Sequence, residues 1–395
     1  MSEENPKIAV LGLGAGGIKI LNALAVLPAA SKLTMVAIDT DAVTLNTCRV
    51  PEANRILADV QWQQGRGCGG DPLKGQRSIA RERENIEPRL AGFDYAILIG
   101  GLGGGLATGA MVALSTLSSR LKLPTVHLLT LPFSWEGDAK RQRAEAALAE
   151  LRPVSDVLLT LPNDLLFSVL LPETPADDAF RLADAEVARA AVAIAELLTC
   201  RSLIPVDFAD LQGVLKSRKC YCSIGVGVAS VAEGGNPGQL AVDRMLAAPL
   251  LGGTGKLKEA DAVLFSVLGG PEFSIANLTQ TTQAAAQCFG EHTEVITGIT
   301  TSDEFKGCVM AAAVAVRYSD RAQLKPKTKQ PSLVEVELSP GEPAAAGEPQ
   351  QLEFELVQRT ISRGIFANSV QISFNGEDLD LPTFARRDVQ IDRGE

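Results

Sequence analysis

Six of the twelve residues from Gly100 to Met111 are glycine, and they follow the apolar run YAILI. A chain keeps so many glycines where its backbone takes positive φ or comes very close to another group. One interpretation is that backbone N–H groups wrap around an anion such as a phosphate. The other is a flexible loop or a tight crossing of two segments, and the cluster alone favours neither.

A second glycine loop, GLGAGG from Gly12 to Gly17, ends the first apolar run, and Asp39 ends the next one. This is the dinucleotide-binding fingerprint, which taken alone predicts an NAD-dependent oxidoreductase. Such an enzyme does not need the glycines after Gly100, and neither histidine, His127 or His292, offers a convincing hydride-transfer site. Two glycine loops after parallel strands instead suggest two loops around one polyphosphate, with a third turn, GRGCGGDP, adding donors.

The elements that position these loops are apolar runs that alternate with helical spacing. Strands are predicted in KIAVLGLG, LTMVAIDTD, FDYAILIGG, LPTVHLLTLPF and VSDVLLTLPND, and helices lie between them. This alternation predicts an α/β fold with a doubly wound, Rossmann-like parallel sheet. Ligands of such sheets bind at the carboxyl ends of the strands, where the unusual loops lie.

A long alanine-rich helix is predicted from Asp178 to Cys200, with apolar residues on more than one side. That pattern suits burial between two domains. Beyond it, CYCSIGVGVAS and ADAVLFSVLGGP predict strands of a smaller α+β domain. The polar, proline-rich chain after about Asp320 predicts a disordered linker and tail.

The composition limits the classes of partner. The net charge of −10 and the pI of about 5.0 argue against a nucleic-acid binder. Seven scattered cysteines argue against a disulfide framework, and Cys220 and Cys222 are interpreted as structural thiols. We find no signal peptide and no run of about eighteen apolar residues, so we expect a cytoplasmic protein without direct membrane insertion.

Several segments resemble, in order, those of the tubulin/FtsZ family. GGLGGGLATGA is similar to the signature G-G-G-T-G-T-G, and KIAVLGLGAGG, AIDTDA and GRGCGGDPLKG resemble the first three loops. LPFSWEG, LPNDLL, AFRLAD and VDFADL resemble later segments, and DLDLPTFARR resembles the FtsZ tail peptide. The resemblance implies a GTP-binding domain at residues 1–178, a central helix at 179–201, a C-terminal domain at 202–318, a flexible linker at 319–375 and a partner-binding peptide at 376–395.

The resemblance also implies which residues surround GTP or GDP. Three loops and the Thr108 hydroxyl would bind the phosphates, although Thr108 has the alternative role of a helix N-cap. Glu136 and Lys140 would lie near the ribose. Phe180 would stack on the base, and Asp184 would accept hydrogens from the ring N–H and the exocyclic amine of guanine. Without the resemblance, these two residues would be interpreted as a core phenylalanine and a surface aspartate. The implied set is Gly14, Ala15, Gly16, Gly17, Gly70, Asp71, Gly103, Gly104, Gly105, Thr108, Gly109, Glu136, Lys140, Asn163, Phe180 and Asp184.

Two carboxylates, Asp207 and Asp210, lie three residues apart at the start of a predicted helix. Taken alone, they are typical helix-capping residues. The resemblance implies instead that they reach the nucleotide of the next subunit and position the water that attacks the terminal phosphate. It therefore implies a homopolymer with a shared GTPase site, and Mg²⁺ bound through the phosphates without a dedicated protein cage.

Four positions depart from the family pattern. Leu106 and Ala107 replace the first Thr and a Gly of the signature, Pro205 replaces an Asn, and Lys19 replaces an Asn after the first loop. The leucine and the proline each remove a hydrogen-bond donor. We therefore expect GTP hydrolysis slower than is usual in the family.

The terminal peptide resembles a segment that docks onto membrane-tethering division proteins. Its matching residues are Leu381, Pro382, Phe384, Arg386 and Arg387. We therefore expect a filament-forming GTPase of bacterial cell division, cytoplasmic and located at the division site as a Z ring. The alternatives are a divergent nucleotide-binding scaffold with weak hydrolysis and, from another class, an NAD-dependent oxidoreductase.

Overall fold

The computed structural model falls into two units, Met1–Pro326 and Lys327–Glu395. In the first unit it describes residues 6–318, except for residues 169, 172, 200, 201, 205, 207 and 216–219. In the second unit it describes only β12 (Ser373–Phe374) and β13 (Glu377–Asp378), which pair antiparallel. The rest of the expected linker and tail peptide lies outside the described residues.

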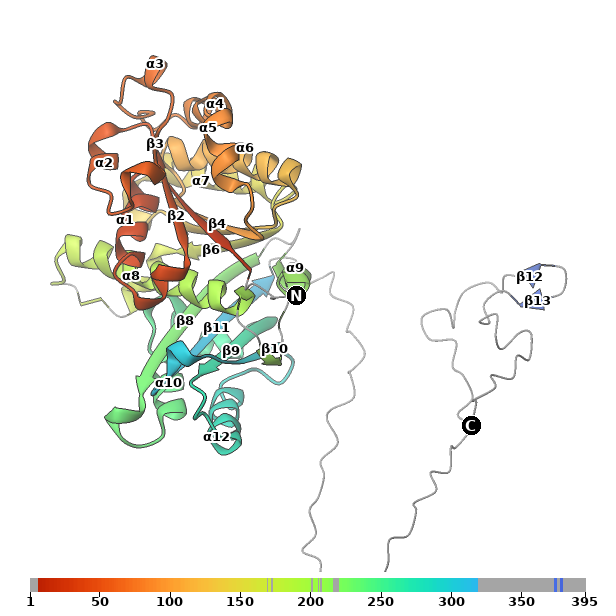
Figure 1. The fold of residues 1–395 in the computed structure, drawn as a ribbon. Coiled ribbons are helices and arrows are strands. Elements are labelled where there is room, and N and C mark those ends of the chain that lie inside the picture. Colours follow the sequence, from red (N-terminus) through yellow and green to blue (C-terminus); the bar gives the residue numbers. More distant parts are fainter. Residues whose placement is uncertain are drawn as a thin grey trace, which may run out of the picture. The chain divides into compact units, whose positions relative to one another are not determined.

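The first sheet is parallel and has six strands in the order β3-β2-β1-β4-β5-β6 (Figure 1). This confirms the expected doubly wound sheet, whose strand order reverses between β1 and β4. The predicted strands form, and the one that escaped prediction is β3, which has three residues. The strands are β1 (Ile8–Leu13), β2 (Thr34–Asp39), β3 (Arg55–Leu57), β4 (Tyr95–Gly101), β5 (Thr125–Leu131) and β6 (Val157–Pro162).

Helices cover both faces of this sheet, so successive residues of each strand are buried in two different cores. In β1, Ile8 and Val10 belong to one core while Ala9 and Leu11 belong to the other. The helices are α1 (Gly14–Leu24), α2 (Ala42–Asn46), α3 (Val60–Gln63), α4 (Pro72–Arg81), α5 (Arg83–Leu90), α6 (Leu106–Leu121) and α7 (Asp138–Leu151). Short 3₁₀ helices, η3 (Ser134–Glu136) and η4 (Asn163–Ser168), follow β5 and β6.

The long helix α8 (Ala176–Thr199) packs against α1 of the first domain and β8 of the second. It begins at Ala176, slightly before the expected residue 179. Its residues Val187 and Ala191 are fully buried in a core that also contains Leu159 of β6 and Val314 of β11. The alanine-rich pattern therefore places α8 between the two sheets, as its apolar sides predicted (Figure 1).

The second sheet is mixed and has the order β7-β10-β9-β11-β8. Strands β9 and β10 are parallel, and the other neighbours are antiparallel. A Cβ on Gly227 of β8 would lie 2.0 Å from the carbonyl oxygen of Ala241, so this glycine lets α10 pack directly on the sheet. The elements are β7 (Ser202–Ile204), α9 (Phe208–Leu215), β8 (Cys220–Ser230), α10 (Pro237–Leu246), α11 (Thr254–Lys258), β9 (Ala262–Gly269), α12 (Ile275–Ala286), β10 (Glu294–Thr301) and β11 (Cys308–Tyr318).

The structure shows the surroundings of two cysteines and one histidine that the sequence analysis discussed. Cys220 and Cys222 are buried, with their Sγ atoms 4.0 Å apart. His127 is buried in β5, where it contacts the Ser115 hydroxyl at 2.7 Å and the Val157 carbonyl at 3.3 Å, and burial lowers its pKa to about 4. Within the described part of the chain, no helix is both long and apolar enough to span a bilayer.

Candidate nucleotide-binding site

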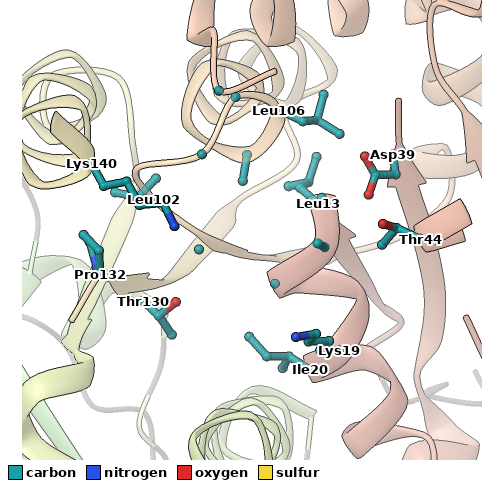
Figure 2. A pocket seen from close by; sticks show the side chains of 18 of the residues that line it. Leu13, Lys19, Ile20, Asp39, Thr44, Leu102, Leu106, Thr130, Pro132 and Lys140 are labelled. Carbon is teal, nitrogen blue, oxygen red and sulfur yellow. The ribbon is translucent and has the colours of Figure 1, made fainter. Parts of the chain in front are cut away.

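A cavity of about 350 Å³ opens at the carboxyl ends of the strands, where the order of the first sheet reverses. Its wall is formed by the loops after β1, β2 and β4, by residues after β5 and β6, and by α8 (Figure 2). Ligand sites of open α/β sheets lie at this position, and the volume falls within the usual range for small-molecule sites. The cavity is therefore the candidate site.

Most of the sequence-predicted residues meet in this cavity. Those that line it are Gly14, Ala15, Gly16, Gly70, Gly104, Gly105, Glu136, Lys140, Asn163, Phe180 and Asp184. Those that do not line it are Gly17, Asp71, Gly103, Thr108 and Gly109. Each of the latter is next to a lining residue in the sequence or the fold, and it supports either a loop of the wall or the packing of a helix behind it.

The first loop passes directly from β1 into α1. Gly14 has φ +67°, a conformation that favours glycine, and Gly16 and Ala15 follow on the cavity side. The first N–H groups of a helix have no partner within that helix, so this turn offers donors to an anion. Gly17 instead permits packing, because its Cβ would lie 2.7 Å from the Ile99 carbonyl oxygen of β4.

The glycine loop after β4 is closed from the inside by Thr108. The Gly103 N–H donates to the Thr108 hydroxyl at 2.9 Å, and the Thr108 side chain is buried. Arg143 of α7 donates from Nε to the Gly103 carbonyl at 2.9 Å, so both backbone polar groups of this glycine (φ +96°) are used. The N-cap interpretation of Thr108 is wrong, because α6 begins two residues earlier with Gly105 as its N-cap.

The third turn reaches the same place because α4 lies against α6. A Cβ on Gly109 would come within 1.8 Å of the Pro72 carbonyl oxygen, so only glycine permits this contact. Asp71 caps α4 by accepting from the N–H of Leu73 at 2.9 Å, and it thereby orders the turn that brings Gly70 to the cavity.

A salt bridge forms the rim on the side of α7. The Lys140 Nζ lies 2.9 Å from Glu136 Oε2, while Glu136 Oε1 accepts from the Phe133 N–H at 2.8 Å. Because Glu136 is fixed at both oxygens, the pair is a positioned polar edge, not the freely solvated helix face that its charge pattern alone would suggest.

Aromatic and polar side chains meet at α8. The Phe180 ring is edge-on to Phe133 and Trp135, with centroids 5.4 and 5.9 Å away. Burial raises the pKa of Asp184 to about 6, and the nearby Lys19 ammonium only partly opposes this effect. Asn163 is 9% exposed and lines the cavity, and among the described residues its Oδ1 has no hydrogen-bond partner. A buried acceptor without a partner is rare in folded proteins, so Oδ1 is available to a ligand donor.

The segment after β2 was matched to a family loop as AIDTDA, but its residues were not included in the predicted binding set, and they form part of the wall. Asp39, Asp41 and Thr44 line the cavity, and Figure 2 shows Asp39 and Thr44 on the side toward which Leu106 projects. Asp39 Oδ1 accepts from the N–H groups of Thr40 and Asp41, but burial dominates and raises the pKa of Asp39 to about 6. Its place at the end of the second strand was the available signal.

The predicted catalytic and tail residues are only partly visible. Asp207 and Pro205 lie outside the described residues, as do Leu381, Pro382, Phe384, Arg386 and Arg387. Asp210 lies in the first turn of α9 and is half-buried, and it does not line the cavity of its own subunit. Leu106 and Ala107, two of the positions that depart from the family pattern, do line the cavity.

Fold and site together define a class: an α/β protein with a crevice for a nucleotide-like ligand between two glycine loops. The strand order is shared with dinucleotide-binding folds, so topology alone does not separate the oxidoreductase alternative from the others. The second glycine loop separates them better, because it lines the same cavity as the first.

Comparison with known proteins identifies the family. The model of the Tubulin/FtsZ family, GTPase domain, matches residues 7–170. An empty FtsZ dimer from M. jannaschii shares 25% identity and a TM-score of 0.66, over 85% of this chain and 96% of that chain. An FtsZ mutant from M. jannaschii shares 28% identity and a TM-score of 0.65, over 80% and 92%. A CetZ2 protofilament from Haloferax volcanii with GTPγS shares the fold at 20% identity and a TM-score of 0.60, over 80% and 95%.

Residues 7–170 therefore belong to the Tubulin/FtsZ family, and the likeness to the FtsZ structures supports the interpretation of the chain as a divergent member of that family. At the level of the family the chain is a GTP-binding, polymerising cytoskeletal protein with a GTPase domain.

Proposed function

We propose that this protein binds GTP in the described cavity, polymerises head to tail, and hydrolyses GTP at sites completed by Asp207 and Asp210 of the next subunit. The observation that carries the proposal is that two glycine loops and the group of Phe180, Asp184 and Asn163 line one cavity. The loops suit phosphates, and the group suits a flat base with hydrogen-bond donors on its edge.

Base recognition rests on three side chains with different tasks. The Phe180 ring offers a surface for stacking, the Asp184 carboxylate accepts two adjacent donors, and the buried Asn163 Oδ1 can accept another. Guanine presents a ring N–H beside an exocyclic amine, whereas adenine presents a ring acceptor at the same position. An ionised Asp184 therefore selects guanine over adenine.

Phosphate binding rests on backbone groups and not on side-chain cations. The charged lining residues are Lys19, the Glu136–Lys140 pair, and Asp39, Asp41 and Asp184, so acidic groups outnumber basic ones. Helix N-termini at α1 and α6 offset part of the phosphate charge. The oxygen donors Asp39 and Thr44 suit Mg²⁺, which when bound neutralises charge on the terminal phosphates.

Hydrolysis needs a water positioned for attack on the terminal phosphate. We infer that the carboxylates that position this water come from the adjacent subunit and not from the subunit that holds the nucleotide. We infer that Asp210, in the first turn of α9, and the preceding Asp207 meet the nucleotide of the adjacent subunit. Positioning and charge stabilisation dominate phosphoryl transfer, so the site works only in a polymer. Leu106 presents an apolar side chain to the cavity in place of a donor, and this supports slow turnover.

We further propose a role in bacterial cell division, at a cytoplasmic Z ring tethered through the peptide at residues 376–395. The support is the resemblance of LPTFARR to tail peptides that bind membrane-tethering partners. The second candidate is a nucleotide-binding scaffold with weak hydrolysis, which the leucine at position 106 favours.

Competition between nucleotides tests the binding proposal. A fluorescent GDP analogue should be displaced by GTP and GDP, and not by ATP or NAD, and Asp184→Asn should weaken GDP binding at least tenfold. Asp178→Asn on the same helix is the matched control, because its side chain is exposed and pairs with Arg181. Displacement by NAD and not by GTP would restore the oxidoreductase alternative.

A further inference from the structure

Lys19 is a cation in the base-binding part of the cavity. It projects from the second turn of α1, beside Ile20 in Figure 2, and lines the cavity together with Phe180 and Asp184. Its Nζ lies 5.7 Å from the centroid of the Phe180 ring, over the ring face. Its charge also acts on the Asp184 carboxylate, so these three groups share one small region.

Lys19 differs from the other lysine of the lining. Lys140 is held by Glu136 at 2.9 Å on the rim, whereas Lys19 forms no ion pair within the described residues. The ring face and the Asp184 field hold the ammonium in place without using its hydrogens. Three N–H donors at the base end therefore remain available to a ligand.

The Lys19 ammonium and the Asp184 carboxylate together match the hydrogen-bonding edge of guanine. Guanine carries a keto oxygen at position 6, next to the ring N–H and the 2-amine, so an acceptor adjoins two donors. An ammonium beside a carboxylate presents the complementary order. Adenine carries an amine at position 6, and this amine would face a group that can only donate.

We propose that Lys19 is a specificity-determining residue that donates a hydrogen bond to the 6-keto oxygen of the bound purine while Asp184 accepts from the adjacent N–H groups. The inference deepens the proposed function and rests on guanine-nucleotide binding. Where the family pattern has an asparagine, whose amide both donates and accepts, this chain has a group that only donates. Lys19 therefore makes the pocket more stringent against adenine.

The test removes the two partners separately. Binding of GDP, IDP and 2-aminopurine riboside diphosphate is measured for the wild type and for Lys19→Met, which keeps the aliphatic stem. IDP retains the 6-keto group and the ring N–H and lacks the 2-amine, whereas the 2-aminopurine nucleotide lacks both the 6-keto group and the ring N–H. Lys258→Met, on the exposed face of α11, is the control variant.

The proposal predicts that Lys19→Met weakens GDP and IDP about tenfold and the 2-aminopurine nucleotide less than twofold. Lys19→Arg, which keeps a charged donor, should retain most of the affinity for GDP. An equal loss for all three nucleotides would show that Lys19 acts on the phosphates, and an unchanged GDP affinity would show that it has no role; either result overturns the inference alone. A wild type that binds none of the guanine nucleotides would overturn the proposed function as well.

Discussion

The hydroxyl of Thr108 accepts the backbone N–H of Gly103 at 2.9 Å and so ties the glycine loop to the first turn of α6. Gly103 is held on its other side by Arg143. The loop that carries the most glycine in the chain is thus fixed by two side chains, and its order does not require a ligand. This arrangement presents preorganised backbone donors to an anion.

Thr108→Val should therefore weaken nucleotide binding about threefold to tenfold without a change of side-chain shape. It should also lower the free energy of unfolding by about 1–3 kcal/mol, because the Gly103 N–H is left buried without a partner. Thr108→Ser keeps the hydroxyl and is the control. Titration with a fluorescent GDP analogue and urea unfolding would check both effects, and equal behaviour of Val and Ser variants would contradict the role of this hydrogen bond.

Close packing of α4 on α6 makes Gly109 sensitive to substitution. Gly109→Ala should lower the free energy of unfolding by more than about 2 kcal/mol, since the new Cβ would meet the Pro72 carbonyl oxygen at 1.8 Å. Gly104→Ala is the matched control, because no atom of the described residues lies within 4 Å of its Cβ position. Denaturant midpoints measured without nucleotide would separate the two, and a stable Gly109→Ala protein would contradict the packing of the third turn.

Asp39 should make stability depend on pH. Its pKa rises from 3.8 to about 6 on folding, so the folded state favours the protonated form, and this contribution is present below pH 3.8 and lost as pH rises through 6. Asp39→Asn should therefore be more stable than the wild type at pH 7.5, by about 1–3 kcal/mol. Near pH 4 the difference should shrink, because both side chains are then uncharged.

Urea unfolding of both proteins across pH 4.5–7.5 would check this prediction, and the pH dependence contributed by His127 cancels in the comparison. A difference that stays constant with pH would mean that Asp39 is not buried as the structure places it.

Leu106 should limit the rate of hydrolysis. Leu106→Thr restores a hydroxyl at the cavity wall and should raise GTP turnover about tenfold, at some loss of stability because the leucine is 5% exposed. Val112→Thr, farther along α6 and away from the cavity, is the control. Single-turnover phosphate release in polymerised samples would measure the effect, and equal rates for both variants would remove Leu106 from the explanation of slow turnover.

The sequence predicted the parallel sheet well because its strands are buried on both faces and therefore read as continuous apolar runs. The strand β3 was missed because three residues, Arg55 to Leu57, form no such run. The central helix α8 was predicted almost to its ends, since its apolar residues recur over many turns.

The site was predicted as a set of residues, but the distinction between wall and support was not. Gly16 and Gly17 are alike in the sequence, yet one lines the cavity and the other packs on β4, because that depends on the approach of a distant strand. The role of Arg143 likewise depends on a partner far along the chain, the Gly103 carbonyl. Local patterns carry no information about such contacts.

Phosphate release from GTP, measured against protein concentration with light scattering on the same sample, tests the central proposal most directly. The account predicts that release begins only above a critical concentration, together with scattering, and that Asp210→Asn scatters without release. Release that is proportional to protein concentration in samples that do not scatter would contradict a site completed by a second subunit.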